Sequence, residues 1–275
     1  MNPFSGDQEL AHELSVALAA AREAAETARA MQAGISSSAK ADGSPVTPGD
    51  LAADAIIRHH LASQFPDDGI LSEELADAPE RLGKRRVWII DPIDGTKEYV
   101  VGGDSWAVQI GLAIDGVIRL GVLDMPGLGV CLSGIPGAGA WRRDGQGISP
   151  LVPKVPVANV LISSASERNA KALTALRNTL PEFSAITATS VGVKVLHLLQ
   201  GDADLYVHSR QIHEWDSAAP AAVLQAAGGF ATALDGQPLV FNSPRGRSAG
   251  LLFSVRPDHT ALAARLAAAG IVSPP

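Results

Sequence analysis

Hydrophobic side chains recur at intervals of three and four residues in the first part of the chain. Leu10, Leu14 and Leu18 begin this series within residues 8–32, and alanines continue it. The spacing predicts a long amphipathic helix whose small-residue face suits close packing. Gly, Ser and Pro interrupt the series over residues 33–46, which predicts a loop or a short hairpin.

A second helix is predicted over residues 48–65. Thr47 and Asp50 have the spacing of a capping box, in which each side chain accepts a hydrogen bond from the backbone N–H of the other residue. Pro48 falls at the first helical position, where a missing N–H is harmless, and Pro66 follows the last one. Asp50 therefore has a structural explanation before any functional one.

In the rest of the chain the first predicted elements are strands, and strands and helices alternate after them. Short apolar runs predict strands at residues 69–74 and 87–90, followed by a glycine-punctuated antiparallel meander over 106–145. The elements predicted after these are a strand and a helix within 159–180, a helix at 190–201, a strand at 203–208, a helix at 216–229, a strand at 250–255 and a helix at 259–269.

This order of elements predicts an α/β (α+β layered) fold, in which helix layers stack on sheets. Three prolines fall within residues 150–156, and we place the boundary between two sub-domains there. The N-terminal sub-domain, residues 1–152, then carries most of the acidic motifs. The C-terminal sub-domain, residues 153–275, is expected to complete the site.

Composition narrows the class of protein. The 275 residues, 46% hydrophobic and 19% charged, are typical of a globular protein with a sizeable core. No run approaches the roughly 18 apolar residues of a membrane span. Cys131 is the only cysteine, which excludes an internal disulfide and fits a reducing compartment. The first 14 residues have neither a basic start nor an apolar core, so we expect no signal peptide and a cytoplasmic location.

The formal net charge of −7 disfavours a nucleic-acid polymer as partner, because such a partner requires a basic surface. A small phosphorylated metabolite remains compatible with this charge if bound divalent metal supplies the positive charge. Binding of divalent metal would also explain why acidic residues outnumber basic ones.

Five acidic residues lie where predicted strands end or helices begin. Glu73 and Glu74 close one strand, Asp91 and Asp94 follow another, and Asp216 begins a helix. Ligand crevices of α/β proteins lie at such positions. Taken singly, each acid is explained by a turn or a helix cap. Taken together, hard oxygen ligands without paired histidines or cysteines favour Mg²⁺ or Mn²⁺.

Three segments in the order "SEE" (72–74), "DPIDGT" (91–96) and "WDSAA" (215–219) carry a resemblance to a known group. They resemble the lithium-sensitive, magnesium-dependent phosphatase superfamily, which includes inositol monophosphatases, fructose-1,6-bisphosphatases and 3'(2'),5'-bisphosphate nucleotidases. The resemblance runs from Lys40 to Gly229. It implies an αβαβα sandwich of the sugar-phosphatase type and a metal-dependent phosphomonoesterase that Li⁺ inhibits.

The resemblance also implies a ligand set for two to three Mg²⁺ ions, with Mn²⁺ as a substitute. Glu73, Asp91 and the backbone carbonyl of Ile93 are expected to hold the first ion, with a third, weaker ion near Glu73. Asp91, Asp94 and Asp216 are expected to hold the second ion. In such a two-metal site one ion activates the attacking water and the other stabilises the leaving alkoxide.

Catalytic roles follow from the same resemblance. Thr96 resembles the threonine that orients the attacking water with the help of Glu73, and Asp50 resembles the aspartate that accepts the threonine's proton. Asp50 would then cap a helix and serve catalysis at once. Gly95 and Thr96 are expected to open a helix whose backbone N–H groups face the phosphate.

Within the superfamily, the residues after this Gly-Thr pair favour one branch. Residues 97–99, Lys-Glu-Tyr, and the stretch "KADGSPVT" at 40–47 are similar to bacterial 3'(2'),5'-bisphosphate nucleotidases, which hydrolyse adenosine 3',5'-bisphosphate to AMP. Lys97 therefore joins the candidate substrate-binding residues. Ser209 stands where inositol enzymes typically place an acid. The chain departs from the nucleotidase pattern at Pro48-Gly49, where relatives often have two alanines.

A bisphosphate needs a second anion site. Ser163, Ser164 and Ser190, at predicted helix starts, are candidate donors to phosphate or ribose, and Lys194 is a candidate partner of the 5'-phosphate. The structural alternative makes the serines plain helix caps and Lys194 a solvated surface residue.

Four other questions stay open. The substrate is alternatively an inositol, histidinol, sugar or secondary-metabolite phosphate. A catalytically silent binding module is disfavoured because every expected ligand is present. His208 and Arg210 precede Trp215 and face either the ligand or the solvent. A homodimer is common among such relatives, but no interface is identified from the sequence.

Overall fold

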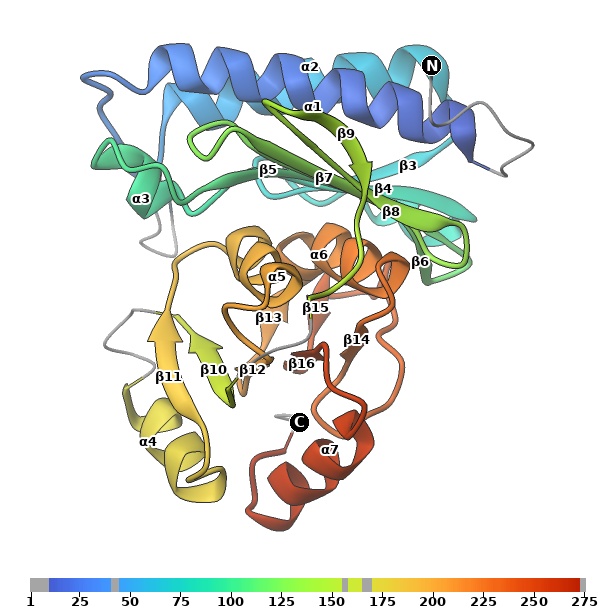
Figure 1. The fold of residues 1–275 in the computed structure, drawn as a ribbon. Helices are drawn as coiled ribbons and strands as arrows, with labels where there is room; N and C mark the ends of the chain where they lie inside the picture. The colour runs from blue at the N-terminus through green and yellow to red at the C-terminus, as the bar shows by residue number, and fades with distance from the viewer. Residues whose placement is uncertain (1–9, 41–44, 155–157, 165–169, 273–275) are drawn as a thin grey trace.

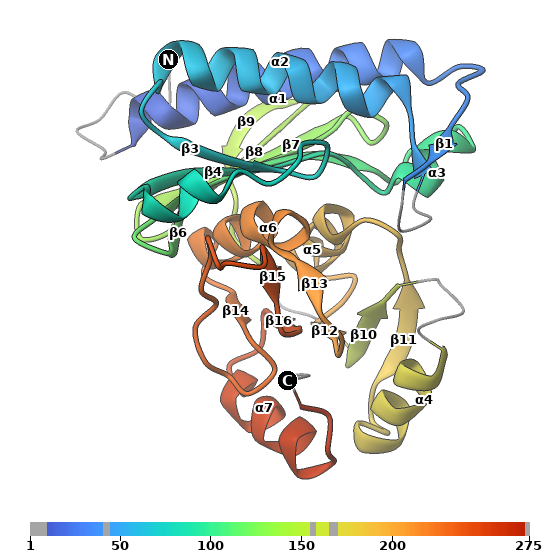
Figure 2. The ribbon, with the colours of Figure 1, turned by 180° about the vertical axis from the view of Figure 1, so that it is seen from behind.

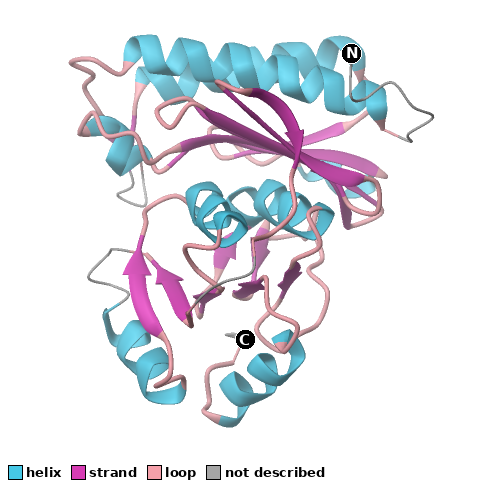
Figure 3. Cartoon of the chain, viewed as in Figure 1, coloured by secondary structure: helices cyan, strands magenta, loops and turns pink. Residues whose placement is uncertain are grey.

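The computed structural model describes residues 10–40, 45–154, 158–164 and 170–272. Helix layers alternate with two β-sheets (Figures 1 and 3). The same succession of layers is seen from behind (Figure 2). The predicted αβαβα arrangement is therefore confirmed.

The first layer consists of α1 (Ala11–Met31) and α2 (Pro48–Gln64), which pack against each other and cover one face of the larger sheet. The buried face of α1 is almost entirely alanine, so the two helices approach closely. Between them, β1 (Ser38–Ala39) and β2 (Pro45–Val46) form the short hairpin that the sequence left open.

The larger sheet has seven strands in the order β3-β4-β5-β6-β7-β8-β9. Its strands are β3 (Gly69–Ser72), β4 (Arg86–Asp94), β5 (Ala107–Ile114), β6 (Val117–Met125), β7 (Val130–Ile135), β8 (Gly139–Asp144) and β9 (Gly147–Pro150). β3 and β4 pair in parallel, and the later pairs are antiparallel, which confirms the predicted meander.

The middle helix layer, α5 (Val191–Gln200) and α6 (Glu214–Ala226), lies between the two sheets (Figure 1). Glycines in the larger sheet admit α6, because a Cβ at Gly121 would lie 2.5 Å from the carbonyl oxygen of Ala219. The end of β4 lies beside the first turns of α5 and α6. The candidate site lies there.

The smaller sheet has the strand order β11-β10-β12-β16-β14. Its strands are β10 (Val160–Ser163), β11 (Ser184–Thr187), β12 (Leu205–His208), β14 (Phe230–Thr232) and β16 (Leu251–Ser254), and β13 (Ile212–His213) pairs separately with β15 (Arg247–Ser248). The outer layer is α4 (Ala170–Thr179) and α7 (His259–Ala268).

Three predictions of local structure need correction or addition. The edge strand β11 was not predicted, because its four residues are mostly exposed and show no alternation. A 3-10 helix, η1 (Pro79–Gly83), lies between the strands predicted at 69–74 and 87–90, where no helix was predicted. Asp216 does not cap α6: the cap is His213, and Asp216 is the third helical residue.

The boundary predicted at residues 150–156 lies between the two sheets, since β9 ends at Pro150 and β10 begins at Val160. The division into sub-domains 1–152 and 153–275 stays a prediction. Within the described ranges, none of the helices has the length and apolar character needed to cross a lipid bilayer.

Candidate active site

A β-bulge at the end of β4 brings two acids to one side of the sheet. Asp91 pairs with Gln109, but Asp94, three residues on, pairs with Ala107, only two residues back along β5. Residues three apart in a regular strand face opposite sides, so the extra residue turns Asp94 to the side that Asp91 faces. The spacing of the DPID motif thus becomes a pair of convergent carboxylates.

The first turn of α6 supplies a third acid. Single ligand atoms of Asp91, Asp94 and Asp216 all lie within 4.8 Å of one another. The backbone N–H of His213 donates to Asp216 Oδ2 at 3.2 Å, which fixes the direction of that carboxylate. Three of the predicted metal ligands therefore meet at one point.

Burial makes this cluster unfavourable as a set of free charges. It raises the pKa values of Asp91 and Asp216 well above the ordinary range, with repulsion from the neighbouring acids adding to the shift. Burial also raises the pKa of Asp94. Buried carboxylates with raised pKa values are characteristic of sites that bind a cation or transfer protons. The all-oxygen donor set fits a hard divalent ion.

The N-terminus of α5 holds Asp94 in place. Ser190 Oγ donates to Asp94 Oδ2, and the backbone N–H of Gly192 donates to the same oxygen at 3.0 Å. Ser190 Oγ also accepts from the N–H of Val193, so it caps the helix as well. Ser190 is fully buried, and its hydroxyl contacts a predicted metal ligand.

Lys194 is fully buried rather than solvated, so the surface alternative for it is wrong. Its ammonium group donates to the carbonyl oxygens of Thr189 at 2.8 Å and Ser190 at 3.2 Å. Burial lowers the pKa of Lys194 to about 8, although Asp94 and Asp216 act in the opposite direction. The structure thus places a cation behind the acidic cluster.

Glu73 lies beside the cluster but is turned toward Lys40. The Lys40 ammonium group donates to Glu73 Oε1 and to Glu74 Oε1, both at 2.7 Å. Burial raises the pKa of Glu73, while Lys40 and a hydrogen bond with Asp91 oppose the shift. No sequence pattern assigns a role to Lys40, because its approach to Glu73 and Glu74 depends on the fold.

Asp50 serves the helix cap and the predicted catalytic pair with different oxygens. Asp50 Oδ2 accepts from the Thr47 backbone N–H at 2.8 Å and from the Thr47 hydroxyl at 2.6 Å, which confirms the predicted capping box. The other oxygen, Oδ1, lies 3.4 Å from Thr96 Oγ1. Thr96 Oγ1 also lies 3.1 Å from the carbonyl oxygen of Ile93. The predicted neighbours Asp50, Thr96 and Ile93 are therefore brought together.

Gly95 precedes the short helix α3 (Thr96–Val100), and its φ of +98° is one that side chains rarely adopt. A Cβ there would also lie 3.2 Å from the carbonyl oxygen of Ser105. Glycine is therefore required for the turn that carries the chain from Asp94 to Thr96. Lys97, in the same helix, is exposed.

A cavity of about 430 Å³ adjoins the cluster. Asp94 and Asp216 line one end, and the remaining walls come from Ser164, Thr189, Val191, Tyr206, His208, Arg210, Gln211, Ile212 and His213. Burial, with Arg210 and Lys194 nearby, lowers the pKa of His208 to about 4, so its imidazole is neutral. The His213 and Trp215 rings stack with centroids 4.1 Å apart.

The predicted substrate-binding residues divide into two groups. Ser164 lines the cavity, whereas Ser163 is buried in β10 and Ser190 and Lys194 are buried behind the cluster. The direct phosphate contacts predicted for these buried residues stay predictions. Ser190 and Lys194 would first have to give up the hydrogen bonds that their side chains make.

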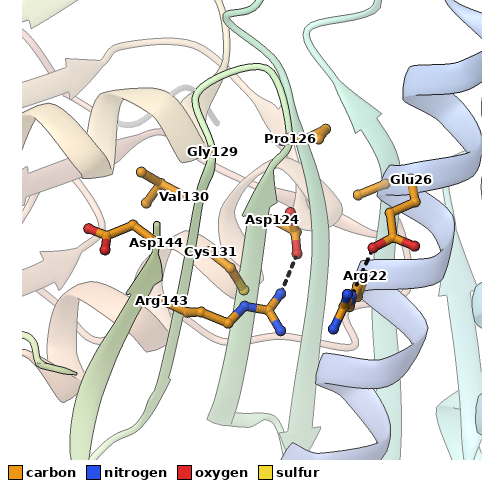
Figure 4. A pocket seen from close by; sticks show the side chains of 10 residues that line it. Arg22, Glu26, Asp124, Pro126, Gly129, Val130, Cys131, Arg143 and Asp144 are labelled. Atoms are coloured by element: carbon orange, nitrogen blue, oxygen red, sulfur yellow. Dashed lines mark hydrogen bonds and ion pairs between the residues drawn. The ribbon is translucent and has the colours of Figure 1, made fainter. Parts of the chain in front are cut away.

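A second cavity of about 330 Å³ lies between α1 and strands β6 to β8 (Figure 4). Arg143 Nη2 pairs with Asp124 Oδ2 at 3.1 Å, and Arg22 pairs with Glu26. Burial raises the pKa of Asp124 to about 6. The acids Glu26 and Asp124 of this cavity are each paired with an arginine. The cavity can therefore supply a control residue for the acidic cluster.

A family model, curated relatives and solved structures agree on the protein family that this chain resembles. The inositol monophosphatase family model matches residues 8–269. A 3'-phosphoadenosine 5'-phosphate phosphatase of Mycobacterium tuberculosis is 36% identical over 197 residues, covering 70% of this chain and 71% of the relative. A 3'(2'),5'-bisphosphate nucleotidase CysQ of Escherichia coli is 33% identical over 209 residues, covering 75% and 82%.

A histidinol-phosphatase of Chlorobaculum parvum is 30% identical over 233 residues, covering 76% of this chain and 83% of the relative. Among solved structures, an inositol monophosphatase from Anabaena (Nostoc) sp. PCC 7120 superposes with a TM-score of 0.75 at 26% identity. That superposition covers 95% of this chain and 97% of the other. The similarity thus extends through both sheets and the site between them.

Proposed function

The chain belongs to the inositol monophosphatase family and is a phosphatase, and on that premise we propose that it is a Mg²⁺-dependent 3'(2'),5'-bisphosphate nucleotidase. In this proposal it hydrolyses adenosine 3',5'-bisphosphate to AMP and phosphate. The relatives named as phosphatases of that nucleotide are also among the more similar in sequence.

The observation that carries the nucleotide assignment is the cavity beside the acidic cluster. It joins two of the cluster's carboxylates, Asp94 and Asp216, to a wall containing Tyr206, His208 and Arg210. An aromatic ring and a neutral imidazole suit a nucleobase, and a guanidinium group suits a second phosphate. Ser209, in place of an acid, makes an inositol hydroxyl a poorer match.

The metal assignment rests on the donor set. Asp91, Asp94 and Asp216 would hold Mg²⁺, with Glu73 and the Ile93 carbonyl completing the ligands once Glu73 exchanges its contact with Lys40. Bound Mg²⁺ supplies a Lewis acid that activates water and neutralises charge developing on the phosphoryl oxygens.

The chain's own residues then act on the water and the phosphate. Thr96 Oγ1 orients the attacking water, and Asp50 Oδ1 accepts the Thr96 hydroxyl proton, in keeping with their 3.4 Å separation. Glu73 assists in removing the water proton. The backbone N–H groups of Gly95 and Thr96 face the scissile phosphate, and Lys194 offsets the negative charge of the acids from behind.

A second candidate is histidinol phosphate, which the Chlorobaculum parvum relative favours. The catalytic roles are the same in that case, and only the contacts in the cavity differ. Arg210 and His208 would then meet an imidazole and an amine, and a cation beside that amine is unfavourable. The nucleotide therefore remains the better match.

The assignment is tested by comparing kcat/KM for adenosine 3',5'-bisphosphate, inositol-1-phosphate, fructose-1,6-bisphosphate and histidinol phosphate, each with Mg²⁺. We expect the nucleotide to be favoured about a hundredfold, which corresponds to roughly 2.7 kcal/mol of transition-state discrimination. A higher kcat/KM for another of these substrates would keep the phosphatase assignment and reject the nucleotide.

A further inference from the structure

Gln109 is a polar residue in the interior of the larger sheet that the proposed reaction does not use. It lies in the middle of β5, and its side chain is 0% exposed. Its two cross-strand partners are Asp91 on β4 and Leu123 on β6. Partners in register face the same side of a sheet with Cβ atoms about 5 Å apart. Of these two partners, only Asp91 has a polar side chain.

The Gln109 carboxamide is not satisfied. Neither Nε2 nor Oε1 has a hydrogen-bond partner among the residues that the structure describes. A buried amide left without partners is destabilising, because the loss of its hydrogen bonds to water is not compensated. Such groups are uncommon in native proteins, and each one calls for an explanation in terms of function or a change of state.

Gln109 lies on the face of β5 that packs against α5 and α6, the face on which its partner Asp91 also lies. On the same face of β5, a Cβ at Gly111 would lie 3.0 Å from Ala218 Cβ on α6. Two residues before Gln109, Ala107 lies against Gly192 on α5, where a Cβ would be 3.1 Å away. The side chain is therefore enclosed by the sheet and by the two helices whose first turns hold Asp94 and Asp216.

We propose that Gln109 is a positioning residue for Asp91, to which its carboxamide donates a hydrogen bond when the carboxylates converge on a divalent ion. Asp91 Oδ1 already accepts from the backbone N–H of Ile93 at 3.1 Å, so one donor is fixed and a second completes the orientation of the carboxylate. Outer partners of this kind typically change metal affinity or activity ten- to a hundredfold when they are removed.

This inference rests on the proposed metal site, and the two are separated by measuring metal binding and unfolding on the same variants. Gln109→Met removes both polar atoms and nearly preserves side-chain volume. We expect its Mg²⁺ dissociation constant, measured by titration calorimetry, to rise roughly tenfold or more. We expect its stability to urea in EDTA to equal or exceed that of the wild type, because two unsatisfied buried groups are removed.

Gln225→Met is the matched control. Gln225, at the far end of α6, donates to the Ala231 carbonyl at 3.1 Å, so its replacement should lower stability in EDTA and leave the Mg²⁺ dissociation constant unchanged. If Gln109→Met does not fold, Gln109→Leu removes the same polar atoms and takes its place.

Wild-type Mg²⁺ affinity in the Gln109 variant would overturn the inference while leaving the proposed function intact. Lower stability of that variant in EDTA would also overturn it, since the carboxamide would then have a partner without the metal. Failure of the wild-type protein itself to bind Mg²⁺ would overturn the proposed function and the inference together.

Discussion

The Asp91→Asn variant is expected to lose phosphate release almost completely, with kcat/KM lowered about a thousandfold or more, or roughly 4 kcal/mol. Asp91 is the central acid of the cluster, because Glu73, Asp94 and Asp216 all act on its pKa. An uncharged amide in its place would be a weaker ligand for a hard divalent cation. The loss should appear in kcat and in the Mg²⁺ dependence together.

The same substitution should spare the fold. In EDTA, Asp91→Asn removes one of several mutually repelling buried acids, so its free energy of unfolding should be no lower than that of the wild type. Measurement of phosphate release and of urea unfolding on one preparation separates chemistry from stability. This combination distinguishes a metal ligand from a structural turn residue.

Asp124→Asn provides the matched control for this experiment. Asp124 is another buried acid with a raised pKa, but it faces the second cavity and pairs with Arg143 (Figure 4). The control should keep its activity and its Mg²⁺ dependence. An Asp91→Asn enzyme that behaves in the same way would remove Asp91 from the metal site.

Removal of the metal should make stability strongly dependent on pH. The folded-state pKa values of Asp91, Asp94 and Asp216 are raised above the ordinary value of 3.8, and burial raises the pKa of Glu74 to about 7. The folded protein therefore holds more protons than the unfolded chain above about pH 4. Stability in EDTA should fall as pH rises from 4 through 7.

Each extra proton held by the folded state contributes a slope of about 1.4 kcal/mol per pH unit. With saturating Mg²⁺ the fall should flatten or reverse, because the ion binds the ionised carboxylates and only in the folded state. Urea unfolding at several pH values, with EDTA and with Mg²⁺, measures both slopes. Equal slopes in the two conditions would contradict a buried carboxylate metal site.

Much of this site is predictable from the sequence, because several of its acids belong to short motifs whose members lie close together along the chain. The DPID motif and the capping box at Thr47 are short-range patterns, and they place Asp91, Asp94 and Asp50 at the ends of elements. The bulge that turns Asp94 toward Asp91 is not visible, since it depends on the register between β4 and β5.

The residues that the sequence did not reveal act across long separations. Lys40 meets Glu73 and Glu74 more than thirty positions along the chain. The role proposed for Gln109 depends on Asp91 in the neighbouring strand β4. A single glutamine in an apolar stretch does not indicate which residue lies beside it in the sheet. Ser190 appears as a helix cap, and only the fold shows that its hydroxyl also holds Asp94.

The most direct test of the account is phosphate release from adenosine 3',5'-bisphosphate by the wild-type protein after chelation and after return of Mg²⁺. We expect activity to disappear in EDTA and to recover as Mg²⁺ is restored. Undiminished hydrolysis by the chelated, metal-free protein would contradict the account, because the acidic cluster would then have no part in the reaction.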